Sequence, residues 1–354
     1  DVFERIKTKY LSEFIGIVII AFTLFVAVFA YYIAPDSSPF ANEMHLELST
    51  LYPGTEVVFI KEKVVEQQKQ SNGFINRLIY GKNQAYVFLP VHSFKVEDSL
   101  IIYNPYGSSY YKELPISSQR NFKIEDFSHT RKYYLGTDKY GRDVLSRLLV
   151  AARISLIVGF ISVFISLFIG LFLGLIAGYY GSWLDALIMW FINVVWSIPT
   201  LLMVIAISLA LGKGLWQVFV AVGLTMWVEV ARVVRGQVLS LKQKEYIQAA
   251  KVLGFSDLRI MFWHLLPNIM SPIIVISAAN FASAILIEAG LSFLGIGAQA
   301  PVPSWGSMIK DHYAYIILDK AYLAIAPGVA IMLLVFAFMM VGNMLREHFD
   351  VRSS

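Results

Sequence analysis

Long uncharged apolar runs recur along the chain and are separated by shorter polar segments. The first run holds no charged residue between Glu13 and Asp36, and about 20 apolar residues suffice for a helix to cross a hydrocarbon core. It exceeds the apolar part of a signal peptide and further runs follow it, so we interpret it as a retained helix. The pattern predicts six membrane-spanning helices, at residues 14–34, 155–178, 186–211, 214–234, 269–291 and 322–344.

One long polar stretch, residues 36–150, separates the first two predicted spans. It contains short runs rich in β-branched and aromatic residues, "EVVFIKEKVV", "AYVFLPVHSFKV" and "SLIIYNPYG", punctuated by Pro, Gly and Asn. Such runs predict strands joined by turns, so we expect a small, mainly β domain; "KEKVVEQQKQSNGFINRLI" is also compatible with a helix. The predicted division is a tail and first helix at 1–35, an inserted domain at 36–135 and a helical core at 136–354.

Lysine and arginine residues in short loops predict the orientation of the spans. With a cytoplasmic N-terminus, six alternating spans leave few basic residues in the short outer loops: Lys213, Lys310 and Lys320. The cytoplasmic side then carries Arg5, Lys7, Lys9, Arg232, Arg235, Lys242, Lys244, Lys251, Arg259, Arg346 and Arg352. This bias predicts that both termini are cytoplasmic and that the inserted domain is extracytoplasmic.

Composition agrees with a membrane protein and excludes several kinds of chemistry. The chain is 57% hydrophobic and 15% charged, whereas soluble domains are about 25% charged. Cysteine is absent, which excludes disulfides and thiol catalysis. The six histidines show no zinc-ligand spacing, and neither a Walker A loop nor a G-x-S-x-G elbow occurs. The net charge of +4 does not indicate nucleic-acid binding, because basic residues border the apolar runs.

Residues 245–268, "EYIQAAKVLGFSDLRIMFWHLLPN", form a half-apolar segment between two predicted spans. Gly254 predicts the end of a first helix and Ser256 the start of a second, which Pro267 would stop. The first helix has one apolar stripe at helical spacing, Tyr246, Ala249, Ala250 and Leu253, and the second has another, Leu258, Met261, Phe262 and Leu265. Periodicity alone leaves two interpretations open, a knob that docks on another protein and a helix that lies on lipid headgroups.

The same segment resembles the EAA loop of ABC importer permeases. Five residues match that motif: Ala249, Ala250, Gly254, Leu266 and Pro267. Gln248 stands where Glu is usual and His264 where Ile is usual. Histidine at this position is familiar in the oligopeptide and dipeptide permease branch, so the second departure narrows the resemblance to that branch.

The resemblance extends over residues 131–354 and the first span, and is closest to the C-type permease subunit of peptide importers. Its other segments are "LGTDKYGRDVLSRLLVAARISL", "ARVVRGQVLSLKQKEYIQAAKVLG", "EAGLSFLGIGAQAPVPSWG" and "PGVAIMLLVFAFMMVGNMLREHFD". Residues 40–130 are not covered. Trp190, Asn193 and Asn343 depart from the residues usual in related permeases.

What the resemblance implies is an all-α polytopic protein of the ABC type I importer permease fold, in a bacterial inner membrane, with the β domain inserted between helices 1 and 2. Expected partners are a second homologous permease in a heterodimer, two cytoplasmic ATPases that bind ATP and Mg, and an extracytoplasmic substrate-binding protein. The chain itself would be non-catalytic and hold no cofactor. ATPase coupling at about 240–268 would rest on Tyr246, Gln248, Ala249, Ala250, Gly254, Phe255, His264, Leu266 and Pro267.

Polar residues elsewhere give two candidates for the entrance or gate. "GTDKYGRD" is a polar turn before the second span, with Gly136, Asp138, Gly141, Arg142 and Asp143, and the resemblance implies that it gates or braces that span outside. Glu288 is an ionisable residue near the outer end of the fifth span, with either a functional or a structural role.

Two packing features are expected within the membrane. Glu229 and Arg232 lie three residues apart and can pair on one helix. Glycines at 159, 170, 174 and 178 permit close helix approach in the second span.

The leading interpretation is therefore a peptide-importer permease that moves peptides by alternating access. A competing class is a membrane-anchored binding or assembly protein in which the inserted domain acts. Permeases for nickel and for peptide antibiotics are related alternatives.

Overall fold

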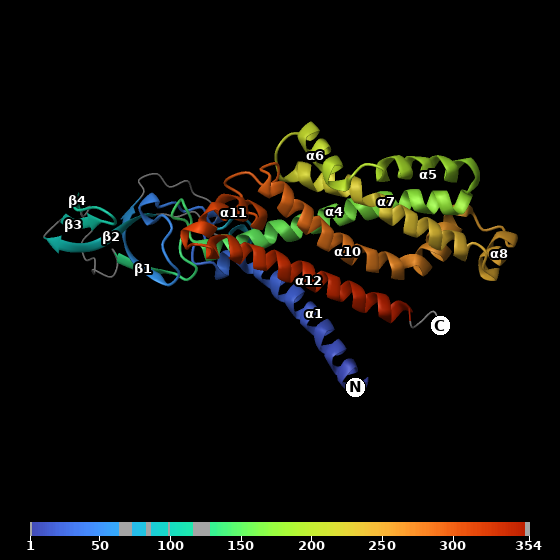
Figure 1. Cartoon of the computed structure of the whole chain (residues 1–354), viewed down its shortest axis with the longest axis horizontal. Helices are drawn as coiled ribbons and strands as arrows, with labels where there is room; N and C mark the ends of the chain where they lie inside the picture. Colours follow the sequence, from blue (N-terminus) through green and yellow to red (C-terminus); the bar gives the residue numbers. More distant parts are fainter. Residues whose placement is uncertain (1, 64–72, 83–85, 98–99, 116–127, 351–354) are drawn as a thin grey trace. The chain divides into compact units, whose positions relative to one another are not determined.

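The computed structural model describes residues 2–63, 73–82, 86–97, 100–115 and 128–350 (Figure 1). The chain divides into two compact units, and each is described by itself. The first combines Asp1–Leu24, Ile154–Gln299 and Val329–Ser354. The second combines Phe25–Arg153 with Ala300–Gly328.

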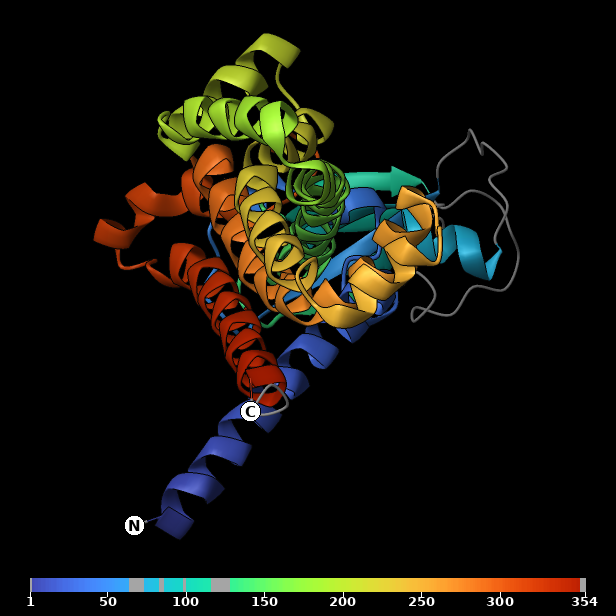
Figure 2. The same cartoon turned by 90° about the vertical axis from the view of Figure 1, so that its right-hand side faces the viewer.

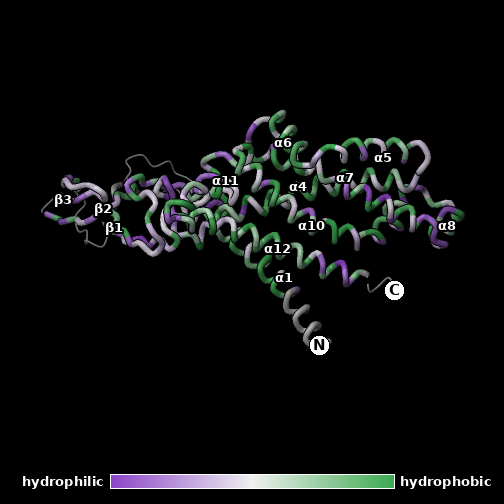
Figure 3. The backbone as a smooth tube through the Cα atoms, viewed as in Figure 1, coloured by the Kyte–Doolittle hydropathy of each residue, from purple (hydrophilic) through white to green (hydrophobic). Residues whose placement is uncertain are grey.

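Five helical segments among the described residues are long and apolar enough to span a membrane. They are Glu13–Ile33 within α1 (Val2–Ile33), α4 (Val144–Tyr180), α7 (Leu215–Leu241), Asp257–Phe293 and Tyr322–Phe349 within α12 (Tyr322–Asp350). Hydrophobic residues run along all of them (Figure 3). The structure thus confirms a mostly helical membrane protein.

The predicted third span, 186–211, is not a straight helix. It is divided into α5 (Ser182–Trp196) and α6 (Thr200–Leu211), which are bent by 90°. Pro199 lies at the break and disfavours helical geometry at the residue before it. Six spans result only if this bent pair counts as one.

The fifth predicted span begins earlier than expected. Helix α9 (Asp257–Arg259), the π-helical turn η3 (Ile260–Leu265) and α10 (Leu266–Phe293) follow one another without a break. The prediction that Pro267 stops the helix was wrong. Pro267 lies in the first turn of α10, where the missing backbone N–H is tolerated, and the wider π turn ends just before it.

Glycines bring α4 and α7 into close contact, and the two helices run side by side (Figures 1 and 2). A Cβ atom added at Gly174 would lie 2.6 Å from the Ala231 carbonyl oxygen. The contacts pair Gly170 with Val230, Gly174 with Val234 and Gly178 with Val238, while Gly159 faces Phe281 of α10. The predicted close approach is confirmed, and any larger residue in this stripe would separate the helices.

The second unit contains the predicted β domain. A five-stranded antiparallel sheet has the order β4-β3-β2-β1-β5. Its strands are β1 (Thr55–Lys63), β2 (Tyr86–Glu97), β3 (Leu100–Pro105), β4 (Lys112–Pro115) and β5 (Ser128–Tyr133). One hydrophobic cluster of this domain contains Leu48, Val57, Phe59 and Tyr133.

Short helices complete the second unit. They are η1 (Pro39–Ala41), η2 (Leu46–Leu48), α2 (Phe74–Tyr80), α11 (Trp305–His312) and η4 (Tyr313–Leu318). Helix α2 falls in the stretch for which a helix was the alternative prediction, of which residues 64–72 lie outside the described residues. The predicted domain boundaries at 35 and 135 stay predictions.

Candidate functional site

The 245–265 segment is a helix, a tight turn and a second helix. Helix α8 (Glu245–Val252) ends in a Schellman motif, in which the N–H groups of Gly254 and Phe255 donate to the carbonyls of Lys251 (3.0 Å) and Ala250 (3.1 Å). The φ angle of Gly254 is +78°, which confirms it as the predicted helix end. Ser256 takes the N-cap position of α9, although its side chain makes no capping hydrogen bond.

Helix α8 buries one face within the chain and leaves another open. Its buried side chains are Ile247 and Ala250, and these pack with Val234 and Val238 of α7. Of the predicted apolar stripe, Ala250 is buried, whereas Tyr246, Ala249 and Leu253 are exposed and so remain available to a partner or to a lipid surface. Ile247, which lies outside that stripe, anchors the buried face.

Large apolar side chains of the segment are left open to solvent. Val252 is 88% exposed and Trp263 is 79% exposed. Met261 and Leu265 of the second predicted stripe are buried, whereas Leu258 and Phe262 are exposed. An open hollow of about 770 Å³ is lined by Leu258, Arg259, Phe262, Trp263 and His264. Contiguous exposed apolar surface of this kind is typical of an interaction site.

Tyr179 joins the 245–265 segment to the ends of two spans. This residue lies near the end of α4 and is buried, and its hydroxyl donates to Oδ1 of Asp257 at 2.6 Å. The Lys242 ammonium, after the end of α7, donates to the Tyr179 carbonyl, and the Lys251 ammonium lies 5.1 Å from the centre of the tyrosine ring. Burial and the nearby Lys251 lower the pKa of Lys242. The segment is therefore held to α4 and α7 by polar contacts as well as by its buried face.

The two departures from the EAA pattern both make local contacts. Nε2 of Gln248 donates to the carbonyl of Lys242 at 2.9 Å, a bond that an ionised glutamate could not donate. The His264 ring stacks on Phe255 with centroids 5.8 Å apart, and the Arg259 guanidinium covers the same phenylalanine at 4.2 Å. Leu266 and Pro267 form the first turn of α10 and take no part in these ring contacts.

The polar turn at 136–143 is brought together as a buried cluster. Nε of Arg142 donates to Oδ2 of Asp138 at 2.6 Å, and both side chains are at most 3% exposed. Oδ1 of Asp138 accepts the backbone N–H groups of Tyr140 and Arg142. Gly136 and Gly141 have positive φ angles of 71° and lie against the backbone of Leu51 and His45. These contacts support a bracing role more directly than a gating one.

Asp143 caps helix α4. Its Oδ2 accepts the backbone N–H of Ser146 at 2.8 Å, the hydrogen bond of an N-cap residue, and the Ser146 hydroxyl also donates to it. The same serine oxygen accepts the N–H of Asp36 at 2.8 Å. Burial raises the pKa of Asp143, while the hydrogen bonds from Ser146 act in the opposite direction. The turn thus ties the start of α4 to the chain after α1.

Glu288 is buried near the end of α10, where it holds a loop. Its Oε1 accepts the Ser292 hydroxyl at 2.6 Å, and the Ser292 oxygen accepts the N–H of Ala298 at 3.0 Å. This geometry supports the structural role for Glu288.

Arg232 does not pair with Glu229 as predicted. Its Nη2 donates to Oδ1 of Asn193 at 3.0 Å, and its guanidinium carbon lies 3.4 Å from the centre of the Trp196 ring. Both partners lie on α5, which holds Arg232 of α7 away from Glu229.

Sequence reasoning also missed Tyr179, Asp257 and the most exposed apolar residues of the segment. A tyrosine ending an apolar span and the adjacent "FW" of 262–263 were the available signals. Among the described residues, no group of three or more His, Asp or Glu is placed to hold a metal ion.

Comparison with known proteins decides the family. Residues 170–353 match the family described as "Binding-protein-dependent transport system inner membrane component". The chain belongs to this family. Like its other members, this permease is a multi-pass inner-membrane protein, a non-catalytic subunit of an ABC transporter that works with ATPase subunits.

Two relatives and one solved structure are similar to the permease. It is 43% identical over 219 residues to the dipeptide transport system permease protein DppC of Alkalihalophilus pseudofirmus, covering 62% of this chain and 72% of the relative. It is 39% identical over 238 residues to the glutathione transport system permease protein GsiD of Escherichia coli O157:H7, covering 67% and 78%. An inward-facing structure of the MetNI methionine ABC transporter aligns with a TM-score of 0.47 and 19% identity, covering 56% of this chain and 95% of that one.

Proposed function

We propose that this permease is one of two homologous membrane subunits that form the pathway of a peptide importer. The names of its relatives, a dipeptide and a glutathione permease, support small peptides as the substrate class. In this proposal an extracytoplasmic binding protein delivers the peptide. Alternating access of the two permeases then carries it inward while the ATPases hydrolyse ATP.

The observation that carries the proposal is the exposed apolar surface of the 245–265 segment. Val252, Leu258 and Trp263 are each more than 60% exposed and are suited to a groove on an ATPase. The buried Ile247 and the Tyr179–Asp257 hydrogen bond connect that surface to α7 and α4. If the docked segment moved as a rigid unit, α4 and α7 would therefore move with it.

The distribution of basic residues supports the required orientation. Lys242, Lys244, Lys251 and Arg259 all lie in or next to the 245–265 segment, which the positive-inside rule assigns to the cytoplasm. Both termini are then cytoplasmic, and the β domain is extracytoplasmic. In this proposal the buried Asp138–Arg142 turn braces the outer start of α4.

The β domain is proposed to dock the binding protein or to cover the entrance. Its position in the chain, directly before the Asp138–Arg142 turn, supports this role. Deleting residues 45–125 should lower uptake and the affinity for the binding protein. Unchanged uptake and unchanged affinity would remove this part of the proposal.

A charge on the exposed surface of the segment tests the coupling role. Val252→Glu, reconstituted with its partners, should insert normally but lower peptide uptake and ATPase co-purification at least several-fold. Ile317→Glu is the matched control, because Ile317 is 86% exposed on η4, outside both the segment and residues 45–125. If Val252→Glu transported peptides as well as Ile317→Glu, the segment would not be the site of coupling.

A further inference from the structure

Helix α7 carries a single acidic residue, Glu229, in the middle of its membrane-spanning length. The side chain is exposed, and among the described residues no cation lies within ion-pair distance of it. Arg232, one turn further along, is held by Asn193 and Trp196 instead. An ionisable group inside a membrane span that is not paired within its own chain indicates a site for a ligand or a partner group.

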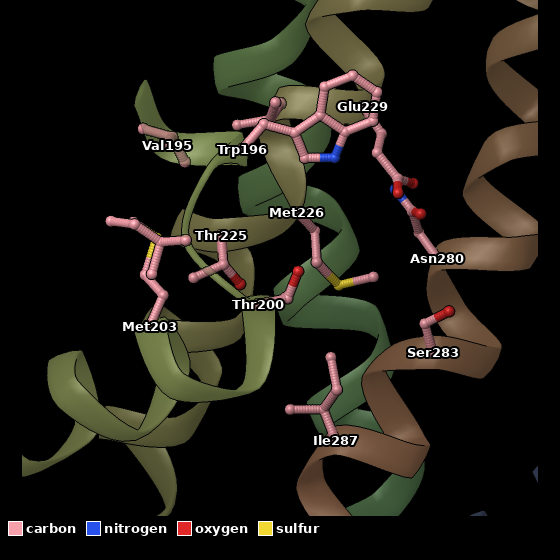
Figure 4. Close-up of a pocket in the computed structure, with 12 residues that line it drawn as sticks. Val195, Trp196, Thr200, Met203, Thr225, Met226, Glu229, Asn280, Ser283 and Ile287 are labelled. Atoms are coloured by element: carbon pink, nitrogen blue, oxygen red, sulfur yellow. The ribbon is translucent and has the colours of Figure 1, made fainter. Parts of the chain in front are cut away.

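Glu229 lines a cavity of about 220 Å³ between α5, α6, α7 and α10 (Figure 4). Asn280 of α10 enters the same cavity, and Figure 4 shows its amide and the Glu229 carboxylate pointing toward one another. Asn280 is only 2% exposed, and its Nδ2 has no hydrogen-bond partner. A buried donor without a partner is unfavourable, so this amide is a second indication that a ligand belongs in the cavity.

We propose that this cavity receives the amino-terminal end of the transported peptide, an inference that rests on the proposed function. The Glu229 carboxylate accepts charge-assisted hydrogen bonds from the α-ammonium group. Nδ2 of Asn280 donates to the carbonyl oxygen that follows that ammonium in every peptide. The amino-terminal end of a peptide carries a cation next to a hydrogen-bond acceptor. The Glu229 carboxylate complements the cation, and the Asn280 amide complements the acceptor.

The volume and the lining of the cavity suit a single amino-terminal residue whose side chain can differ from one peptide to another. At about 220 Å³ it is smaller than the roughly 300–1,000 Å³ of pockets that enclose a drug-sized ligand, so the remainder of a peptide extends beyond it. Met203, Met226 and Ile287 contribute apolar surface. Methionine side chains adapt to differently shaped neighbours, which fits a transporter that accepts several side chains.

The absence of native cysteine allows a direct test. Ser283, an exposed residue of the same cavity, is replaced by cysteine in the full complex in detergent. Modification of this chain by cationic and by anionic methanethiosulfonate reagents is then followed by intact mass. Relative to the same rate ratio at Ile75→Cys, the cationic reagent should be favoured about tenfold, the effect of a nearby weakly screened charge, and Glu229→Gln should abolish that excess. Ile75→Cys is the control, whose rate ratio Glu229→Gln should leave unchanged.

Ligand protection identifies the group that is recognised. Dialanine should slow modification of the Ser283→Cys complex, whereas N-acetyl-dialanine should not. A rate ratio equal to that of Ile75→Cys, as expected if a partner subunit's cation neutralises Glu229, would overturn the proposal, and so would equal protection by the two peptides. Peptide uptake by the wild-type complex is measured in parallel. If the wild-type complex takes up peptides but the Ser283→Cys complex shows no charge preference, only this inference is contradicted. If the wild-type complex takes up no peptide, the proposed function itself is contradicted.

Discussion

The hydroxyl of Tyr179 donates a 2.6 Å hydrogen bond to the carboxylate of Asp257, which joins the end of α4 to the start of α9. The two residues are 78 positions apart in the chain. Because the 245–265 segment also packs on α7, it cannot move without acting on both spans. The Tyr179–Asp257 bond is therefore expected to transmit force as well as to stabilise the fold.

Removing this hydrogen bond should uncouple the transporter. Tyr179→Phe keeps the aromatic ring near Lys242 and Lys251 but removes the donor to Asp257. Hydrogen bonds to charged groups contribute about 1.5–3 kcal/mol, so we expect intact assembly with more ATP hydrolysed per peptide transported. Tyr180→Phe is the control, because Tyr180 is 45% exposed. Equal coupling ratios in the two variants would contradict the role of Tyr179.

A side chain at Gly254 should damage the turn without any steric clash. No atom lies within 4 Å of a Cβ built at this position, but its φ of +78° costs about 1–2 kcal/mol for an L-residue. The Gly254→Leu variant should therefore insert and assemble normally, but its complex should hydrolyse ATP with little peptide uptake. Gly236→Leu adds the same side chain at a helical glycine that also has open space. Normal coupled transport by Gly254→Leu would show that the geometry of the turn is unimportant.

The glycine stripe of α4 should be intolerant of even one methyl group. Gly174→Ala places a Cβ 2.6 Å from the Ala231 carbonyl oxygen, and such overpacking costs about 1–3 kcal/mol. We expect a lower midpoint of thermal unfolding for the purified complex. Gly290→Ala in α10 meets open space and should be neutral or slightly stabilising. Similar midpoints for the two variants would argue against close α4–α7 packing.

The Asp138–Arg142 pair should be far more important for stability than an exposed pair of the same domain. Asp138→Asn leaves the buried Arg142 guanidinium without its carboxylate, a change that costs about 3–5 kcal/mol. Glu56 and Lys132 form an exposed pair, with side chains 58% and 47% accessible, so Glu56→Gln should cost at most about 1 kcal/mol. Limited proteolysis of the β domain in the two variants measures the difference, and equal resistance would contradict the bracing role.

Run lengths in the sequence predicted the spans well because hydrocarbon thickness sets a minimum length for each helix. The bend at Pro199 and the continuation through Pro267 were not predicted. A proline can interrupt a helix, or it can lie in the first turn of one. Which of the two occurs depends on the conformation that the preceding backbone can adopt. That adjustment, a sharp break before Pro199 and a π turn before Pro267, depends on packing that spacing does not encode.

In the 245–265 segment, too, local features were predictable from the sequence and long-range contacts were not. Gly254 as a helix end follows from local backbone chemistry and was predicted correctly. The face that packs on α7 was not part of the prediction, because it depends on contacts of Ile247 with Val234 and Val238, which are distant in the sequence. The bonds from Tyr179 to Asp257 and from Gln248 to Lys242 join residues whose proximity exists only in the folded chain.

Cross-linking tests most directly whether an ATPase docks on the 245–265 segment. Val252→Cys, the only cysteine in this chain, is labelled with a photo-activated cross-linker in the assembled complex, and Ile75→Cys serves as the matched control. We predict that Val252→Cys captures an ATPase subunit in a yield that changes with ATP, whereas Ile75→Cys captures none. Failure of Val252→Cys to capture the ATPase, or equal capture from Ile75→Cys, would contradict the account.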